Sequence, residues 1–194
     1  MTKTTRQKQA LETREKLLGA ALQLFSQKGF KESTVKEIGK QAGVTDGLIY
    51  HYFRSKEELL WAVLQKYTIN RPLYQSQFGI DATKSLEDQL VKYFELMFKH
   101  LWEQKNFVVM CFAESQRNPK IHEQLLRIIQ QGCQQLTDFI RSRGNKKEVD
   151  QITIQNLITS QFFYFIMWDR FADNEMDRTN HIEKSVSDFV KVIS

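Results

Sequence analysis

A glycine turn between two short helical segments constrains the fold of this chain more than any other feature of its sequence. Gly43 separates segment 34–42 from segment 45–53, and each is about two helical turns long. Thr34 and Glu37 open the first segment with the spacing of a capping box, in which the hydroxyl accepts from a backbone N–H and the carboxylate reaches back. Two short helices joined by a tight turn form the helix-turn-helix arrangement, which is the predicted structure here.

The sizes of the side chains around the turn suit close packing of the two short helices. Ile38, Val44 and Ile49 supply an apolar wedge between the two short helices. Gly39 and Ala42 are small where the helices approach most closely. The spacing therefore suits two helices in tight contact.

Longer helices are predicted on both sides of this pair. Segment 11–28 carries one apolar face and ends at Gly29, which suits a helix terminus. Ser55 and Glu58 repeat the capping-box spacing at the start of a fourth helix. Beyond a break at Pro72, helices are expected at 86–103, 107–115, 121–142, 149–171 and 182–193, with turns at 117–120, 141–147 and 173–180.

No segment alternates between apolar and polar residues as a half-buried strand does, so the predicted fold class is all-α. The expected architecture is an N-terminal three-helix domain with the helix-turn-helix, residues 1–71, and a larger C-terminal helical domain, residues 72–194.

Charge is distributed unevenly between these two parts. Residues 1–70 hold 12 Lys and Arg against 7 Asp and Glu, whereas residues 71–194 hold 16 against 16, so the whole net charge of +5 lies in the first part. A cationic excess confined to one domain indicates nucleic acid or another anionic surface as its partner.

The two cysteines and the lack of a long apolar run indicate the cellular compartment to expect. Cys111 and Cys133 show neither a disulfide framework nor zinc-site spacing, and free buried thiols in a reducing compartment are expected. No apolar run approaches the roughly 18 residues of a membrane span. We therefore expect a soluble, cytoplasmic protein with no membrane partner.

Four aromatic residues in a row end the second short helix. Ile49, Tyr52 and Phe53 share a face that can pack inward, which leaves Tyr50 and His51 pointing out. The tips of tyrosine and histidine suit phosphate oxygens and base edges in a major groove. Covering a flank of the larger domain is the alternative role for these two side chains.

Three further residues suit contact with phosphate. Gly47 would let a nucleic-acid backbone come close to the helix. Lys56 supplies a charge at the start of the fourth helix, and Thr34 opens a helix whose dipole and exposed N–H groups attract anions.

Residues 11–71 resemble the DNA-binding domain of the TetR family of bacterial transcriptional regulators, above all in STVKEIGKQAGVTDGLIYHYFRSKEELL (33–60). The turn, the aromatic end of the third helix and the following SKEELL fall in register with the family pattern. The resemblance implies DNA contacts at Thr34, Thr45, Gly47, Leu48, Tyr50, His51, Tyr52 and Lys56. Asp46 departs from the pattern and is left out, because a carboxylate near phosphate is repulsive.

The last two expected helices carry broad apolar stripes. Members of the family form homodimers through these helices, and the resemblance implies a four-helix interface here, with an ordinary core as the alternative. The predicted dimer interface comprises Ile154, Leu157, Ile158, Gln161, Phe162, Phe165, Ile182, Val186, Phe189, Val190 and Ile193.

Aromatic and methionine side chains crowd the middle helices. They suit a pocket for an apolar or aromatic small-molecule effector, although plain core packing is the alternative at each position. The predicted pocket residues are Phe94, Met97, Phe98, Trp102, Phe107, Met110, Phe163 and Met167, with His100, Glu114 or Gln161 as polar anchors.

An enzyme is disfavoured because no nucleophile motif or phosphate loop appears, and the four histidines lack metal-ligand spacing. No catalytic residue, metal site or cofactor is predicted. The favoured function is a ligand-responsive DNA-binding transcriptional regulator, a repressor that binds a palindromic double-stranded DNA operator as a homodimer and is released by its effector. The alternative is a helical adaptor that binds a protein partner through the exposed third helix.

Overall fold

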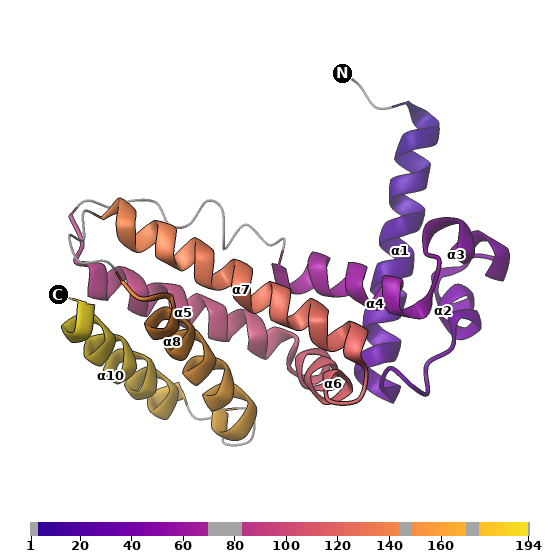
Figure 1. Ribbon diagram of the computed structural model, residues 1–194. Helices are drawn as coiled ribbons and strands as arrows, with labels where there is room; N and C mark the ends of the chain where they lie inside the picture. The colour runs from indigo at the N-terminus through magenta and orange to yellow at the C-terminus, as the bar shows by residue number, and fades with distance from the viewer. Residues whose placement is uncertain (1–3, 70–82, 144–148, 170–174, 194) are drawn as a thin grey trace. The chain divides into compact units, whose positions relative to one another are not determined.

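The computed structural model describes residues 4–69, 83–143, 149–169 and 175–193, and their regular secondary structure is entirely helical, as predicted (Figure 1). The chain forms two compact units. Unit 1 comprises Met1–Asn70 and Asn106–Gln124, and unit 2 comprises Arg71–Lys105 and Leu125–Ser194. The predicted division at residue 71 stays a prediction, because the first unit also takes in a later segment of the chain.

Unit 1 is built on four helices and two later segments. The four are α1 (Thr5–Lys28), α2 (Val35–Ala42), α3 (Asp46–Tyr52) and α4 (Lys56–Leu64), which continues as a π-helical turn over Gln65–Ile69. The later segments are α6 (Lys105–Ser115), whose first residue belongs to unit 2, and the first residues of α7 (Pro119–Ser142). α1 packs against α2 and α4, and α2 packs against α3.

The first helix begins six residues earlier than predicted. Thr4 and Gln7 form a capping box, in which the Gln7 N–H donates to Thr4 Oγ1 at 3.4 Å and the Thr4 N–H donates to Gln7 Oε1 at 3.0 Å. Residues 4–12 are all exposed. Apolar periodicity could not reveal these turns, because none of their side chains faces a core.

The turn between α2 and α3 forms as predicted. The Glu37 N–H donates to Thr34 Oγ1 at 3.1 Å, and the Thr34 N–H donates to Glu37 Oε2 at 3.1 Å, which completes the capping box. Gly43 adopts the left-handed conformation with φ 70° and ψ 32°, where a side chain would be strained. Thr45 is the N-cap residue of α3, but its side chain accepts no capping hydrogen bond.

The core of unit 1 fixes the positions of these short helices. Ile38 and Ile49 are fully buried at the α2–α3 contact, as the predicted wedge requires, and Val44 is half-buried. They join a cluster of buried side chains from α1 and α4: Leu17, Leu18, Ala21, Phe25, Leu59, Leu60 and Val63. Burial of each large aliphatic or aromatic side chain stabilises the fold by about 1.5–3 kcal/mol before conformational entropy is counted.

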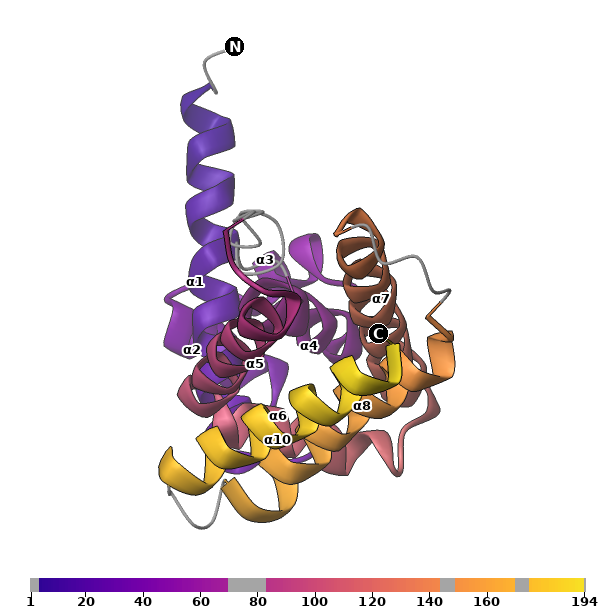
Figure 2. The same cartoon turned by 90° about the vertical axis from the view of Figure 1, so that its left-hand side faces the viewer.

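Unit 2 contains α5 (Leu86–Glu103), most of α7, α8 (Gln151–Tyr164) and α10 (Glu175–Ile193). A π-helical turn, Phe165–Asp169, extends α8. α10 packs against α5 and α8, and Figure 2 shows α8 and α10 side by side. Buried phenylalanines from α5 and the end of α8 occupy the core.

Two predicted boundaries in unit 2 are wrong. Segment 173–180 was expected to be a turn, yet α10 begins at Glu175, and acidic residues in its first turn are favourable at the positive end of the helix dipole. The helix predicted from residue 149 begins at Gln151, because the Asp150 carboxylate caps it by accepting from the Ile152 N–H at 3.2 Å. Pro72 lies outside the described residues.

None of the helices among the described residues is long and apolar enough to cross a membrane. Cys111 and Cys133 are free and buried, as expected, and burial raises the pKa of both thiols. Neither is therefore activated as a nucleophile.

Candidate nucleic-acid interface

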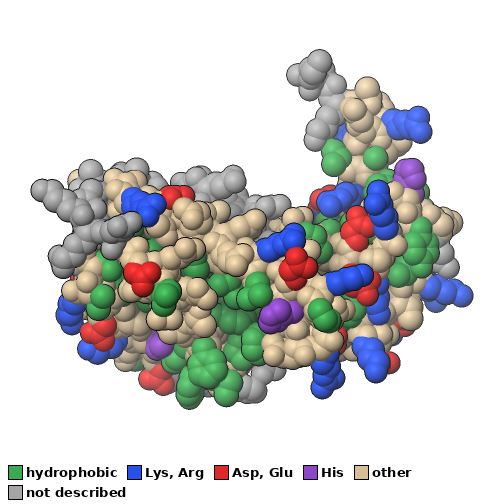
Figure 3. Space-filling model, viewed as in Figure 1, with side chains coloured by type: hydrophobic (Ala, Val, Ile, Leu, Met, Phe, Trp, Pro, Cys, Tyr) green, Lys and Arg blue, Asp and Glu red, His purple; other side chains and the backbone are tan. Residues whose placement is uncertain are grey.

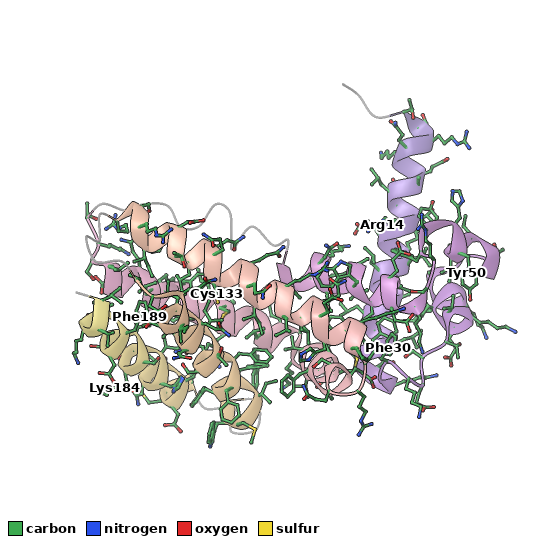
Figure 4. The ribbon with its side chains drawn as sticks, viewed as in Figure 1. Arg14, Phe30, Tyr50, Cys133, Lys184 and Phe189 are labelled. Carbon is green, nitrogen blue, oxygen red and sulfur yellow. The ribbon has the colours of Figure 1, made fainter. Side chains whose placement is uncertain are left out.

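The two faces of α3 have opposite environments. Ile49 and Phe53 are 1% and 3% exposed, whereas Tyr50 is 58% exposed and His51 is also exposed. Tyr52 is half-buried, and its ring meets the imidazole of His51 edge-on, with 5.7 Å between centroids. Figure 4 labels Tyr50 on the helix-turn-helix. The structure therefore places these five side chains as the sequence predicts, with Tyr50 and His51 accessible to a partner.

The other predicted contacts on α3 are also accessible. Thr45, Gly47 and Leu48 are exposed, and Leu48 is a large apolar side chain with 38% of its surface in solvent. A Cβ added at Gly47 would meet nothing within 4 Å. Packing inside the unit therefore does not require glycine there, which is consistent with close approach by an external partner.

α3 is kept short by the residues that follow it. Phe53 leaves the helix with φ −140° and ψ 124°, and Ser55 then caps α4 by accepting from the Glu58 N–H at 3.1 Å. The predicted capping box is only half formed, because the Glu58 carboxylate accepts from the Arg54 N–H at 2.6 Å and not from Ser55. These two hydrogen bonds fix the backbone where the chain leaves α3.

The start of α2 is already occupied by a carboxylate. Glu37 accepts from Thr34 and forms an ion pair with Lys28, whose Nζ lies 2.6 Å from Glu37 Oε1. These bonds, with that to Lys28 the largest effect, lower the pKa of Glu37 to about 2. Thr34 is exposed but its hydroxyl donates to Glu37 at 3.1 Å, so its predicted contact with phosphate would require that bond to be shared.

Lys56 has partners inside the unit. Its ammonium donates to the carbonyl oxygens of Phe30, Lys31 and Ser33 at 2.8, 3.2 and 3.0 Å. The same ammonium lies 4.5 Å from the centre of the Phe30 ring. An ammonium has three N–H donors, so these carbonyls use its whole capacity. In this geometry the ammonium has no spare donor, and the phosphate contact of Lys56 stays a prediction.

Comparison with known proteins agrees with this geometry. The sequence model for bacterial regulatory proteins of the tetR family matches residues 17–63, which span α1 to α4. The chain carries the DNA-binding domain of the TetR family over these residues. It is therefore a DNA-binding transcriptional regulator and not an enzyme.

The similarity to known proteins extends beyond the helix-turn-helix. The HTH-type transcriptional regulator UidR of Escherichia coli K12 is 27% identical over 174 residues, which cover 88% of this chain and 86% of UidR. The regulator YvkB of Bacillus subtilis is 27% identical over 94% of this chain and 97% of its own length. GusR of Salmonella enterica has the same fold, with a TM-score of 0.78 and 23% identity over 93% of this chain and 96% of GusR.

Most of the predicted dimer stripe is covered within the protomer. Most of its members are buried within unit 2 itself, at 0–6% exposure: Ile154, Leu157, Gln161, Phe165, Ile182, Val186, Phe189 and Ile193. Their low exposure shows that these eight side chains pack within the protomer, and the predicted interface stays a prediction. Ile158, Phe162 and Val190 are half-buried.

A different stripe of the same helices is open to solvent. Ile152, Phe163, Met167 and Trp168 are 64%, 53%, 47% and 53% exposed, and on α10 Val192 is 65% exposed. Figure 3 shows hydrophobic side chains gathered on the surface over the end of α8. Exposed apolar patches of this kind mark interaction surfaces.

The predicted effector-pocket residues separate into three environments. Phe94 and Phe98 of α5 and Phe107 of α6 are fully buried, whereas Phe163 and Met167 are exposed. Met97, Trp102 and Met110 are half-buried. Phe107 and Met110 belong to unit 1 and the other six residues to unit 2, and the predicted pocket stays a prediction.

A polar cluster inside unit 2 was only partly anticipated. Gln161 is fully buried, and its Nε2 donates to Ser185 Oγ at 2.5 Å. One turn away, the ring of Tyr164 stacks on His181 with 3.9 Å between centroids and 10° between planes. The sequence suggested Gln161 as a polar anchor, but the partners on α10 lie more than 15 residues away and carried no local signal.

Two atoms of this cluster lack a partner. Gln161 Oε1 and His181 Nε2 are buried, and neither has a hydrogen bond among the described residues. Burial lowers the pKa of His181, because the imidazolium is penalised away from water. No group of three or more metal-binding side chains occurs in the described ranges.

Proposed function

We propose that this regulator is a ligand-responsive repressor that binds a palindromic operator as a homodimer. The observation that carries the proposal is the exposed face of α3 beside its buried face. In this proposal α3 enters the major groove, where Thr45, Gly47, Leu48, Tyr50 and His51 contact the bases and backbone. Tyr52 is half-buried, and in the proposal only its ring edge reaches DNA.

Selection of duplexes from a random-sequence library by the purified protein tests this function. A palindromic consensus is expected, with half-sites about 34 Å apart or a small multiple of that spacing. The binding constant should fall steeply and log-linearly with salt. An adaptor that binds a protein partner through the exposed Leu48 and Tyr50 would select no consensus and would show a shallow salt dependence.

The homodimer is proposed to form through the exposed stripe of α8 and α10. Ile152, Phe163 and Met167 lie on one side of the α8 segment, and their exposure supports contact with a second copy. Interfaces between permanent partners bury apolar and aromatic side chains at their centres. Light scattering at micromolar concentration should give about twice the chain mass.

The effector is proposed to bind in unit 2 beside the polar cluster. Buried acceptors without a hydrogen bond cost about 1–3 kcal/mol, so a ligand that donates to Gln161 Oε1 would recover part of that cost. The ring of Phe98 lies 6.0 Å from that of Tyr164 in the cluster and 6.2 Å from that of Phe165, centroid to centroid. These features support a small aromatic effector that also carries a hydrogen-bond donor.

A thermal-shift screen with small aromatic compounds tests the effector proposal. Compounds with a hydroxyl or amide donor should raise the melting temperature more than their methyl analogues. The preference should disappear in Gln161→Met, which keeps the volume but removes the acceptor.

A further inference from the structure

The outer face of α8 carries no charge. From Gln151 to Trp168 the sequence contains no Asp, Glu, Lys, Arg or His, although Asp, Glu, Lys and Arg make up 26% of the whole chain. One side of this segment is nevertheless open to solvent, with Ile152 64% exposed and Phe163 53% exposed. Solubility favours charged side chains on a face that stays in water, so the uncharged face of α8 suits contact with another protein surface.

The exposed side chains of this face are arranged symmetrically along the helix. The stripe runs at close to helical spacing through Ile152, Asn156, Phe163 and Met167. Four positions separate the first two residues, and four separate the last two. A half-turn about the midpoint of the stripe therefore exchanges Ile152 with Met167 and Asn156 with Phe163. A two-fold interface requires such an exchange, because residue i of one copy contacts residue j of the other and the reverse.

The midpoint of the stripe lies between Thr159 and Ser160, which are both exposed. Thr159 Oγ1 donates to the carbonyl oxygen of Gln155 at 2.7 Å, and Ser160 Oγ donates to that of Leu157 at 2.9 Å. Each hydroxyl proton thus has an acceptor in its own helix. A second helix can cover these two side chains without leaving a donor unpaired.

The outer face of α10 has a different character, because its charges are paired within the protomer. Asp188 Oδ1 accepts from Lys184 Nζ at 3.1 Å and from Lys191 Nζ at 3.3 Å. All three side chains are more than half exposed. Interfaces bury uncharged side chains at their centres and keep charged side chains at the rim. The two helices therefore suit an interface with α8 at its centre and this part of α10 at its edge.

We propose that two copies of α8 pack antiparallel in the homodimer, with the two-fold axis between Thr159 and Ser160. Ile152 of one protomer then packs against Met167 of the partner subunit. A charge close to the axis would meet its own copy, and this repulsion accounts for the uncharged run along α8. Antiparallel helices also place the opposite ends of their dipoles together. This inference rests on the proposed homodimer.

Cross-linking of single cysteines measures this register. The native thiols Cys111 and Cys133 are 1% and 2% exposed, so the wild-type protein serves as a control that should not react. Ser160→Cys is a small change at an exposed site beside the axis, and bis-maleimidoethane should convert most of this variant to a covalent dimer. Ile152→Cys is the matched exposed control. It should stay uncross-linked, because the two copies of position 152 would lie about 22 Å apart along the helices.

A mixed dimer tests the pairing of the two ends of the stripe. Subunits with Ile152→Cys and subunits with Met167→Cys are given different affinity tags, expressed together and purified through both tags. These two subunits should cross-link to each other, whereas Met167→Cys alone should not form a covalent dimer.

Two results would overturn this register. Cross-linking of Ile152→Cys with itself would show parallel helices or an axis near that end of α8. Failure of Ser160→Cys to cross-link, in a variant that is a dimer by light scattering, would place the contact on another surface. A wild-type protein with the mass of one chain would instead contradict the homodimer itself, and light scattering distinguishes that failure from a wrong register.

Discussion

Ile49 and Tyr50 are neighbours in α3, yet one is 1% exposed and the other 58% exposed. This contrast separates the energetic roles of adjacent residues. Ile49 contributes to the contact that orients α3, whereas more than half of the Tyr50 surface is open to solvent and to a partner. Substitutions on the two faces of α3 should therefore change different measured quantities.

Alanine substitutions on the outer face should weaken DNA binding and leave folding nearly intact. Tyr50→Ala and His51→Ala are expected to raise the dissociation constant for the selected duplex, with melting temperatures close to wild type. Phe53→Ala should instead cost about 3 kcal/mol of folding free energy, because it creates a cavity at a site that is 3% exposed. A Tyr50→Ala protein as unstable as Phe53→Ala would show that the outer face is structural.

Two charge substitutions should distinguish the dimer surface from the core of unit 2. Phe163→Glu is expected to give a folded monomer by light scattering, because Phe163 is 53% exposed in the protomer. Phe189→Glu should unfold or precipitate the protein, because it buries a carboxylate at a site that is 6% exposed. A folded dimer of Phe163→Glu would place the interface elsewhere.

The capping box of α2 should contribute less to stability in acid. The folded-state pKa of Glu37 is about 2 and its ordinary value is 4.5, so its contribution is fully present above about pH 4.5 and is lost as pH falls toward 2. Glu37→Gln keeps a capping side chain but removes the charge and the ion pair with Lys28. Urea unfolding should show wild type more stable than Glu37→Gln at pH 6 and the two converging near pH 2. A constant difference across this range would exclude the ionised carboxylate as the cause.

Effector and DNA should oppose each other with equal strength. If an effector raises the dissociation constant of the operator a hundredfold, its own affinity must fall a hundredfold on operator-bound protein, a coupling of about 2.7 kcal/mol. Calorimetry with and without the selected duplex measures this directly. Equal effector affinities in the two titrations would mean that the compound stabilises the fold without inducing release.

Local sequence signals were sufficient for most of unit 1. The capping box of Thr34 and Glu37, the left-handed Gly43 and the inward face of α3 depend on residues no more than four positions apart, and all three formed as predicted. The first two turns of α1 were missed because their side chains touch no core. The sequence predicted that these helices are present, but it did not predict the start of α1, which a polar capping box sets.

Contacts between distant segments could not be predicted in the same way. Lys56 looks like a surface cation from its neighbours, and only the fold brings three carbonyl oxygens from residues 30–33 to its ammonium. His181 and Tyr164 belong to different helices, and their stacking depends on how α8 and α10 pack.

The sequence by itself determined that this chain is helical, where its helix-turn-helix lies and which face of α3 is exposed, because those properties follow from spacing within a few residues. Only the tertiary structure decided which apolar stripe of α8 is core. That helix carries apolar side chains on more than one side, so its own periodicity favours no single face. Packing against α5 and α10 buries Ile154, Leu157 and Phe165 and leaves Ile152 and Phe163 in solvent.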